Sequence, residues 1–246
     1  NDPYLNDTFR IADGLRLARR FLITIAELGL PAATEILDTL TPQYIGDLIS
    51  WTAIGARTAE AQTHREIASG LSTPVGFKNG TDGSFDACVN GIASALGQHH
   101  FLGVTDDGLP AIFATAGNPY AHVVLRGGRD PNFDAEHVAE CERRLKAAHL
   151  PQNIVIDCSH ANSHKKPEEQ GVVLQNILEQ IEHGNTSIRG IMLESFLDWG
   201  NQKIPKDLRE LKPGLSVTDA CIDWATTDTL LREMHARLIP VLKERK

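Results

Sequence analysis

The chain has 246 residues and a formal net charge of −8, from 32 acidic residues against 24 lysines and arginines. This length suits one large domain, and we expect residues 1–246 to form a single domain because no linker or low-complexity tract interrupts them. The negative charge argues against a nucleic-acid partner and favours an enzyme or a binding protein. No apolar run approaches the roughly 18 residues that would span a membrane.

The four cysteines lie far apart and form no CxxC pair. Such spacing favours a reduced, cytoplasmic compartment over a disulfide framework or a thiolate metal site. The chain begins with Asn1 rather than methionine, inside a stretch typical of a loop. We therefore expect that the sequence starts inside a longer gene product.

Helices and strands alternate along the chain. Apolar residues recur at helical spacing from Ile11 to Ile25, and Gly29 occupies a C-terminal cap position, which predicts a first helix. Thr41 and Pro42 are typical of a helix start, as N-cap and first-turn residue. After the first helix we expect a strand over residues 31–37, a helix over 41–49, a strand over 51–56, a helix over 59–71, a strand over 74–78 and a helix over 85–96. Further strands are expected over residues 122–126, 154–157 and 188–194, each followed by a helix.

The alternation is interrupted once. Residues 101–104 and 111–114 are extended apolar runs separated by a turn sequence, which predicts a β-hairpin insertion at about 101–116. The remaining pattern gives six strand–helix units, and such units imply parallel strands in an α/β fold. Two architectures stay open at this point. An open doubly wound sheet is one, although no GxGxxG turn marks a dinucleotide crevice; a (β/α)8 barrel is the other, and it needs two further strands before Asn1.

Charged residues stand at the carboxyl ends of the expected strands, where parallel α/β folds gather their chemistry. These residues are Glu35, Arg57, Lys78, Arg126, His160 and Glu194. Taken singly, each is more simply a solvated surface charge or a helix cap. The three cations, however, follow consecutive strands, and two glycines follow Arg126, leaving a bare backbone that could approach a phosphate closely. In an acidic protein this combination predicts a site for an anionic, phosphorylated ligand.

His160 and Glu194 end successive strands, and Asp219 lies just beyond. One imidazole and two carboxylates suit a divalent first-row metal ion. Asp219 has a simpler reading as the N-cap or first-turn acid of the terminal helix.

The other histidines carry no such pattern. His64 lies in a helical stretch as a surface or interface residue, His99 and His100 flank a loop, and His164 follows His160 outside any helix. Cys158 is more typical of packing in a buried strand than of a ligand.

Several segments along the whole chain share the pattern of one enzyme family. They include Leu30-Pro-Ala-Ala33, Trp51-Thr-Ala-Ile-Gly-Ala-Arg57-Thr, Pro74-Val-Gly-Phe-Lys78-Asn-Gly-Thr-Asp-Gly83, Leu125-Arg126-Gly-Gly128, Asp157-Cys-Ser-His160-Ala-Asn162, Glu194-Ser, Gly200-Asn-Gln202 and Val217-Thr-Asp219-Ala-Cys-Ile222. In these segments the chain resembles the type I 3-deoxy-D-arabino-heptulosonate-7-phosphate (DAHP) synthases of the shikimate pathway. The resemblance implies a (β/α)8 TIM barrel, with strands three to eight and their helices present here.

The resemblance also implies roles. His160, Glu194 and Asp219 would be three of four ligands to one divalent metal ion, Mn, Fe, Co or Zn, whose identity the sequence does not set. Arg57, Lys78 and Arg126 would hold phosphoenolpyruvate, with Glu35 near the water-handling side of the site. Lys78, Glu35 and His160 would then be catalytic in the condensation of phosphoenolpyruvate with erythrose 4-phosphate.

In this family the hairpin and the helices before it help to form a pocket for an inhibitory aromatic amino acid, on homodimers or homotetramers. The residues of this chain that resemble the pocket are Ile67, Leu71, Ser72, Phe101 and Gly103. Glycine rather than serine at position 103 leaves room for a hydroxyl group, which favours tyrosine over phenylalanine as the inhibitor.

Two rival functions remain. A related barrel aldolase, such as an octulosonate 8-phosphate synthase, would use arabinose 5-phosphate instead. Alternatively, the chain is an inactive truncated or decayed copy that acts only as a binding partner.

The chain lacks two segments of the family pattern, and their absence leads to a prediction. The family's fourth metal ligand, a cysteine in a Gly-Pro-Cys-Ser segment, and its Lys-Pro-Arg-Thr segment for erythrose 4-phosphate are both absent from these 246 residues. We therefore expect the 246-residue chain alone to be inactive. Assay of the purified chain with both substrates tests this, and retained turnover would contradict it.

Overall fold

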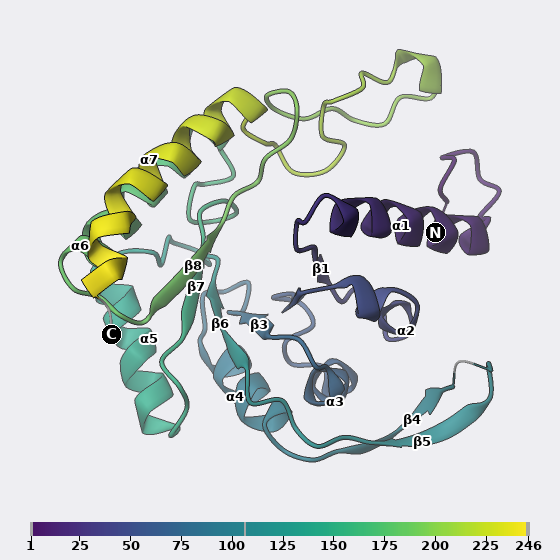
Figure 1. Ribbon diagram of the computed structural model, residues 1–246, viewed down its shortest axis with the longest axis horizontal. Helices are drawn as coiled ribbons and strands as arrows, with labels where there is room; N and C mark the ends of the chain where they lie inside the picture. Colours follow the sequence, from purple (N-terminus) through teal and green to yellow (C-terminus); the bar gives the residue numbers. More distant parts are fainter. Residues whose placement is uncertain (1, 106, 245–246) are drawn as a thin grey trace. The chain divides into compact units, whose positions relative to one another are not determined.

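The computed structural model describes residues 2–105 and 107–244 (Figure 1). Asp106 of the predicted hairpin and residues 245–246 lie outside the described residues. The contacts divide the chain into two compact units. Unit 1 comprises Asn1–Gly80 and Asp86–Val123, and unit 2 comprises Thr81–Phe85 and Val124–Lys246. None of the helices in the described part of the chain has the length and apolar composition of a membrane span.

Unit 1 holds three short parallel strands and a β-hairpin. Its elements are α1 (Ile11–Glu27), β1 (Ala33–Glu35), α2 (Thr41–Ile45), the 3-10 helix η1 (Gly46–Leu48), β2 (Trp51–Ile54), α3 (Gln62–Gly70), β3 (Val75–Lys78), α4 (Asp86–Ala95), β4 (His100–Val104) and β5 (Pro110–Ala114). β1 pairs parallel with β2, and β2 with β3. Helices α3 and α4 pack side by side in this unit (Figure 1).

Unit 2 repeats the same strand and helix pattern. Strand β6 (Ala121–Leu125) is divided between the two units, and its last two residues belong to unit 2. The other elements are α5 (Ala135–Ala147), β7 (Ile154–Asp157), the 3-10 helix η2 (Pro167–Glu169), α6 (Gln170–Glu182), β8 (Ile188–Met192), the 3-10 helix η3 (Leu208–Glu210) and α7 (Trp224–Glu244). β7 and β8 pair parallel, and helices α6 and α7 lie side by side (Figure 1).

The strand order decides between the two architectures that the sequence left open. Hydrogen-bonded neighbours run β1-β2-β3-β6 and then β6-β7-β8, in the order of the chain. A doubly wound sheet reverses its strand order at a switch point, whereas a barrel adds each strand beside the last. The sequential order therefore agrees with the barrel, and the predicted α/β alternation is confirmed. The assignment of residues 1–246 to a single domain stays a prediction.

The four central strands, β2, β3, β6 and β7, are almost entirely buried. All residues of β3 and β6 are buried, and Phe77, Val123 and Ile156 have no exposed surface. Burying an apolar side chain of this size stabilises the fold by about 1.5–3 kcal/mol. This burial explains why the strands have continuous apolar sequences rather than alternating ones.

Several element boundaries differ from the predictions, and strands β1, β2 and β8 are shorter than expected. Thr41 is the first residue of helix α2 rather than its N-cap, which is Leu40, and the Asp38 Oδ1 before the helix accepts hydrogen bonds of 2.8 Å from the backbone N–H groups of Leu40 and Thr41. Helix α3 begins at Gln62 rather than near residue 59, because residues 55–61 form a turn in which the Gly55 carbonyl accepts from the N–H groups of Thr58 and Ala59.

The hairpin insertion is confirmed. β4 and β5 pair antiparallel with Phe101 opposite Phe113, and their rings stack with centroids 5.9 Å apart. Leu102 and Ile112 point to the other face and are 82% and 73% exposed. The alternation follows from the two-residue period of a strand and gives the hairpin one aromatic and one aliphatic face.

A buried histidine links two strands of unit 1. The Trp51 Nε1–H donates to His122 Nε2 at 2.9 Å, and His122 Nδ1 lies 3.0 Å from the Tyr120 carbonyl oxygen. Because the indole only donates and the carbonyl only accepts, His122 carries its proton on Nδ1 and is neutral. Burial lowers the pKa of His122 below its usual 6.5. Protonation would place a second N–H against the indole donor.

We predict that this contact makes the stability of the chain fall at acidic pH. The folded state has the lower His122 pKa, so it binds fewer protons than the unfolded state, and the stabilisation is complete above pH 6.5 and declines as the pH falls below it. His122→Gln keeps an acceptor for Trp51 but does not titrate. Urea unfolding of both proteins between pH 8 and 5 should show their free energies of unfolding converging as the pH falls; a constant difference would refute the assignment.

Candidate active site

The chain after β7 makes a tight turn that carries His160. His160 has a φ of +48°, and His164 and Lys165 are also in the left-handed region. That conformation costs a non-glycine residue about 1–2 kcal/mol. The turn is closed by Lys165 N–H, which donates to the His160 carbonyl at 2.6 Å. Backbone strain of this kind is concentrated at functional sites.

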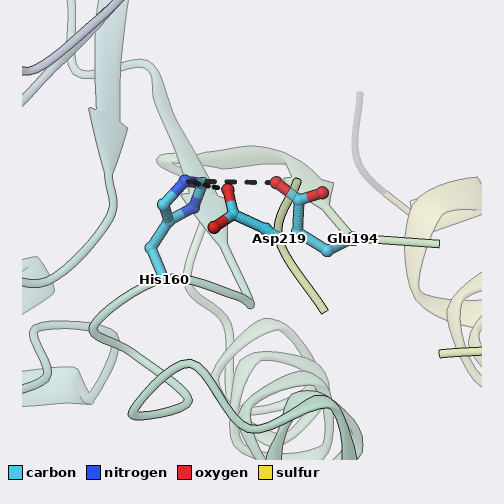
Figure 2. A group of neighbouring side chains, drawn as sticks. All are labelled: His160, Glu194 and Asp219. Carbon is cyan, nitrogen blue, oxygen red and sulfur yellow. Dashed lines mark ion pairs between the residues drawn. The ribbon is translucent and has the colours of Figure 1, made fainter. Parts of the chain in front are cut away.

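His160, Glu194 and Asp219 converge in unit 2 (Figure 2). His160 Nε2 lies 3.7 Å from Asp219 Oδ2 and 4.0 Å from Glu194 Oε1, and one ligand atom of each residue lies within 4.8 Å of the others. A divalent ion with ligand bonds of about 2.0–2.2 Å spans such separations with small side-chain adjustments. The donor set and the spacing therefore fit one metal ion.

Asp219 is not a helix cap. Helix α7 begins at Trp224, and the residue that caps it is Asp223, whose Oδ1 accepts from Thr226 N–H at 2.8 Å. Asp219 instead precedes a segment tied to the end of β8 by two isolated bridges, Ser195 with Ile222 and Gly200 with Cys221. The simpler reading of Asp219 is thereby removed, and the bridges explain how it reaches Glu194.

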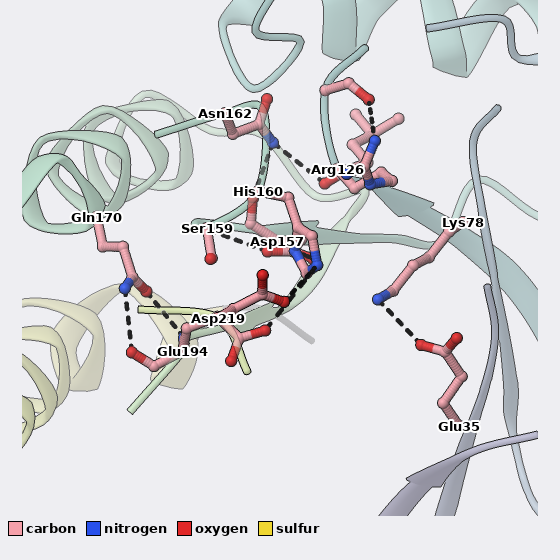
Figure 3. Close-up of polar contacts among 12 residues, drawn as sticks. Glu35, Lys78, Arg126, Asp157, Ser159, His160, Asn162, Gln170, Glu194 and Asp219 are labelled. Carbon is pink, nitrogen blue, oxygen red and sulfur yellow. Dashed lines mark hydrogen bonds and ion pairs between the residues drawn. The ribbon is translucent and has the colours of Figure 1, made fainter. Parts of the chain in front are cut away.

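The main chain of Glu194 is held by a buried glutamine that the sequence did not single out. Gln170 is fully buried at the start of α6, and its Oε1 accepts from Glu194 N–H at 2.9 Å while its Nε2 donates to Glu194 O at 3.0 Å (Figure 3). The same carbonyl accepts from Ile222 N–H at 3.0 Å. Gln170 thus holds Glu194 as a neighbouring strand would, beyond the point where β8 ends.

A second residue outside the predicted set is Asp157, the last residue of β7. Its side chain is 1% exposed, and its Oδ2 lies 2.8 Å from Nδ1 of His160. Its Oδ1 accepts from Ser159 N–H at 2.9 Å (Figure 3). The only sequence signal for Asp157 was its position at the end of a buried strand, three residues before His160.

Buried amides join this turn to the loop after β6. Asn162 Nδ2 donates to the carbonyls of Leu125 and Asp157, and its Oδ1 accepts from Asn132 N–H at 2.8 Å. Asn132 Oδ1 in turn accepts from Gly127 N–H at 2.7 Å. Since both asparagines are at most 4% exposed, these bonds fix the two loops to each other.

Arg126 is half-buried at the end of β6, but the two glycines after it serve a purpose that we did not predict. A Cβ at Gly127 would lie 2.7 Å from the Cβ of Ala161, and one at Gly128 would lie 2.2 Å from the backbone N of Gly83. The missing side chains therefore make room for protein backbone rather than for a phosphate.

Unit 1 contains the other predicted charges. Lys78 Nζ lies 3.3 Å from Glu35 Oε2, with the Lys78 side chain 8% exposed and that of Glu35 32% exposed (Figure 3). A buried ammonium group requires such a partner, because desolvating an unpaired charge is costly. Arg57 is exposed in the turn after β2 and takes no part in this ion pair.

The residues that resemble an inhibitor pocket line one cavity of unit 1. Its volume is about 570 Å³, and Ile67, Leu71, Ser72, Phe101 and Gly103 all contribute to it. The space beside Gly103 is already filled, because a Cβ there would lie 2.7 Å from the ring of Phe113. The room that we expected glycine to leave for a hydroxyl group is thus occupied by an aromatic ring.

Among the residues for which we predicted no functional role, one is placed differently from our expectation. His64 is buried in α3 rather than at the surface. His164 pairs with Glu169 through an exposed contact of 2.7 Å, and burial raises the pKa of Cys158, which suits packing rather than ligation.

Comparisons with known proteins agree with this geometry. The family model described as the DAHP synthetase I family matches residues 1–232. The chain is 50% identical over 238 residues to the Tyr-sensitive phospho-2-dehydro-3-deoxyheptonate aldolase of Salmonella typhimurium, covering 97% of this chain and 67% of that protein. It is 51% identical over 234 residues to the Phe-sensitive enzyme of Escherichia coli, covering 95% and 67%.

A solved structure shows the same likeness in three dimensions. The phospho-2-dehydro-3-deoxyheptonate aldolase of Francisella tularensis superposes with a TM-score of 0.93 at 50% identity, covering 96% of this chain and 69% of that one. The predicted barrel class is confirmed by this neighbour. The chain spans about two thirds of the length of these relatives.

We predict that Gln170 stabilises the fold through its two bonds to Glu194. Gln170→Met removes both bonds and leaves a main-chain N–H without its partner, so unfolding should become easier by about 1–3 kcal/mol. Gln175→Met on the same helix is the matched control, because it also removes two side-chain bonds, to Glu233 and Arg237, but leaves no main-chain group without its partner. Urea unfolding of both variants provides the measurement, and equal effects would contradict the assignment.

Proposed function

This chain belongs to the DAHP synthetase I family, and we propose that its residues serve the condensation of phosphoenolpyruvate with erythrose 4-phosphate. The observation that carries the proposal is the 50% identity over 97% of the chain to an enzyme of that activity. The convergence of His160, Glu194 and Asp219, which are far apart in the sequence, supports it.

His160, Glu194 and Asp219 would hold one divalent ion, Mn, Fe, Co or Zn. When bound, such an ion supplies a Lewis acid that polarises a carbonyl oxygen and offsets developing negative charge. One imidazole and two carboxylates form a donor set whose softness lies between that of a thiolate site and that of an all-oxygen site. Such a set accepts several of these ions. The geometry supports the presence of an ion but not a choice among them.

The reaction joins C3 of phosphoenolpyruvate to the aldehyde carbon of erythrose 4-phosphate. Water then adds at C2 and inorganic phosphate leaves, so the balance is one phosphoenolpyruvate, one erythrose 4-phosphate and one water giving one DAHP and one phosphate. Arg57, Lys78 and Arg126 would bind the phosphate and carboxylate of phosphoenolpyruvate, since fixed cations hold such groups by charge-assisted hydrogen bonds.

Glu35 and Lys78 would take part in proton transfer during the reaction. A carboxylate 3.3 Å from an ammonium group can exchange a proton with it or orient the water that adds at C2. When an anionic ligand binds to Lys78, the ammonium group of Lys78 would interact with both Glu35 and the ligand. We propose Lys78, Glu35 and His160 as the catalytic residues.

We also propose regulation by an aromatic amino acid in the cavity of unit 1, with tyrosine as the inhibitor. Hydroxyl groups of Thr63 and Ser72 line this cavity and offer partners for a phenol. The protein would act in the cytoplasm, as a homodimer or homotetramer. The four cysteines are buried thiols, which suits a reducing compartment.

We predict that the full product of this gene releases phosphate from phosphoenolpyruvate only with erythrose 4-phosphate and a divalent ion. Glu194→Gln and Asp219→Asn should each lower kcat/KM by at least about 100-fold, because an ion worth several kcal/mol to the transition state is lost. Phosphate release is the measurement.

Arabinose 5-phosphate serves as the control substrate, and Asp228→Asn on the exposed face of α7 as the control variant. Activity with arabinose 5-phosphate alone would favour the related octulosonate 8-phosphate synthases. Absence of activity with either sugar would favour a non-catalytic copy.

We further predict stronger inhibition of the full product by tyrosine than by phenylalanine. Gly103→Ser combined with Phe113→Val makes room for a serine hydroxyl beside the ligand, and it should shift inhibition toward phenylalanine. Gly103→Ser alone is the control, since its Cβ would meet the Phe113 ring. Inhibition constants for the two amino acids decide the matter, and a preference for phenylalanine in the unaltered enzyme would overturn the choice.

A further inference from the structure

Beneath the candidate metal ligands lies a carboxylate that the proposed reaction does not use. Asp157 is almost fully buried, and its Oδ2 lies 2.8 Å from His160 Nδ1. We propose that Asp157 is a positioning residue, which fixes the tautomer and ring orientation of His160 so that Nε2 points to Glu194 and Asp219. This inference rests on the proposed metal site.

The tautomer follows from the contacts of the two ring nitrogens. Within the described residues, Nδ1 of His160 is buried and meets the geometry of no hydrogen bond, and the charged group that lies against it is the Asp157 carboxylate, with Oδ2 at 2.8 Å. An ionised carboxylate only accepts, so the ring proton belongs on Nδ1. Nε2 then keeps its lone pair, and it is the nitrogen that lies 3.7 Å and 4.0 Å from the two carboxylates (Figure 2).

Asp157 is itself held in place on both sides. Its Oδ1 accepts from Ser159 N–H at 2.9 Å, and its main-chain carbonyl accepts from Asn162 Nδ2 at 2.8 Å (Figure 3). The left-handed backbone at His160 brings its ring back over a residue only three positions earlier. The carboxylate is therefore a fixed support, and the imidazole adapts to it.

The charge of Asp157 adds to the effect. A carboxylate on the far side of a ligating imidazole strengthens the ring as a donor and usually accounts for 10–100-fold in metal affinity. Asp157 can do this without contacting the ion, because it acts through the ring.

The chain provides a matched control. Asp134 and His137 have the same three-residue spacing and an Oδ2 to Nδ1 distance of 2.7 Å, but their side chains are 42% and 45% exposed, and Asp134 caps helix α5. Asp134→Asn therefore alters a carboxylate–histidine pair with the same spacing in the sequence but without Glu194 or Asp219 as partners.

The test measures the tautomer of His160 by 15N NMR of the metal-free protein, and then the affinity for Mn²⁺ and Co²⁺ by competition with a chelator. The unaltered protein should show the proton on Nδ1. In Asp157→Asn the side-chain amide can donate to Nδ1, so the proton should move to Nε2 and metal affinity should fall 10–100-fold. Asp134→Asn should change neither.

Two results would overturn the proposal. One is a proton on Nε2 of His160 in the unaltered protein, which needs no variant to fold. The other is a folded Asp157→Asn protein with unchanged tautomer and metal affinity. A protonated Nδ1 in a protein that binds neither metal would instead contradict the proposed function and leave the positioning of His160 supported.

Discussion

Buried side-chain amides form hydrogen bonds with main-chain N–H and carbonyl groups near the ends of the parallel strands. The rest of the candidate site depends on these bonds. In unit 2, Gln170 pairs with both main-chain groups of Glu194, and Asn162 donates to the carbonyls at the ends of two strands. In unit 1, Asn118 donates to three carbonyls around the end of α3. Buried main-chain groups must be paired, and past the end of a strand no neighbouring strand remains to do it.

Burial is graded across the candidate metal site. The side chains are 1% exposed at Asp157, 18% at His160, 33% at Glu194 and 56% at Asp219. The supporting carboxylate is thus shielded, so its interaction with the imidazole is weakly screened, while the outermost ligand remains open to solvent. Such a gradient lets an ion and a substrate enter a site whose inner half is already fixed.

The sequence located the central strands of the fold but not the residues that support the candidate site. Continuous apolar runs, such as the one ending at Asp157, located the four central strands, because almost all residues of β2, β3, β6 and β7 are buried. The supports of the site had no comparable signal. A glutamine in an amphipathic helix gives no sign that its amide will meet Glu194, 24 residues away, and the contact exists only after α6 packs beside β8.

The sequence by itself determined which residues are chemically able to hold a metal ion and anions, because residue type and strand-end position follow from local pattern. Only the tertiary structure decided what surrounds them. It assigned the cap of α7 to Asp223 and placed Asp219 beside His160 and Glu194, and it filled the space at Gly103 with the ring of Phe113. The physical reason is that the type of a residue sets which ligand atoms its side chain offers. The space around that side chain and its orientation depend instead on neighbours that are distant in the chain.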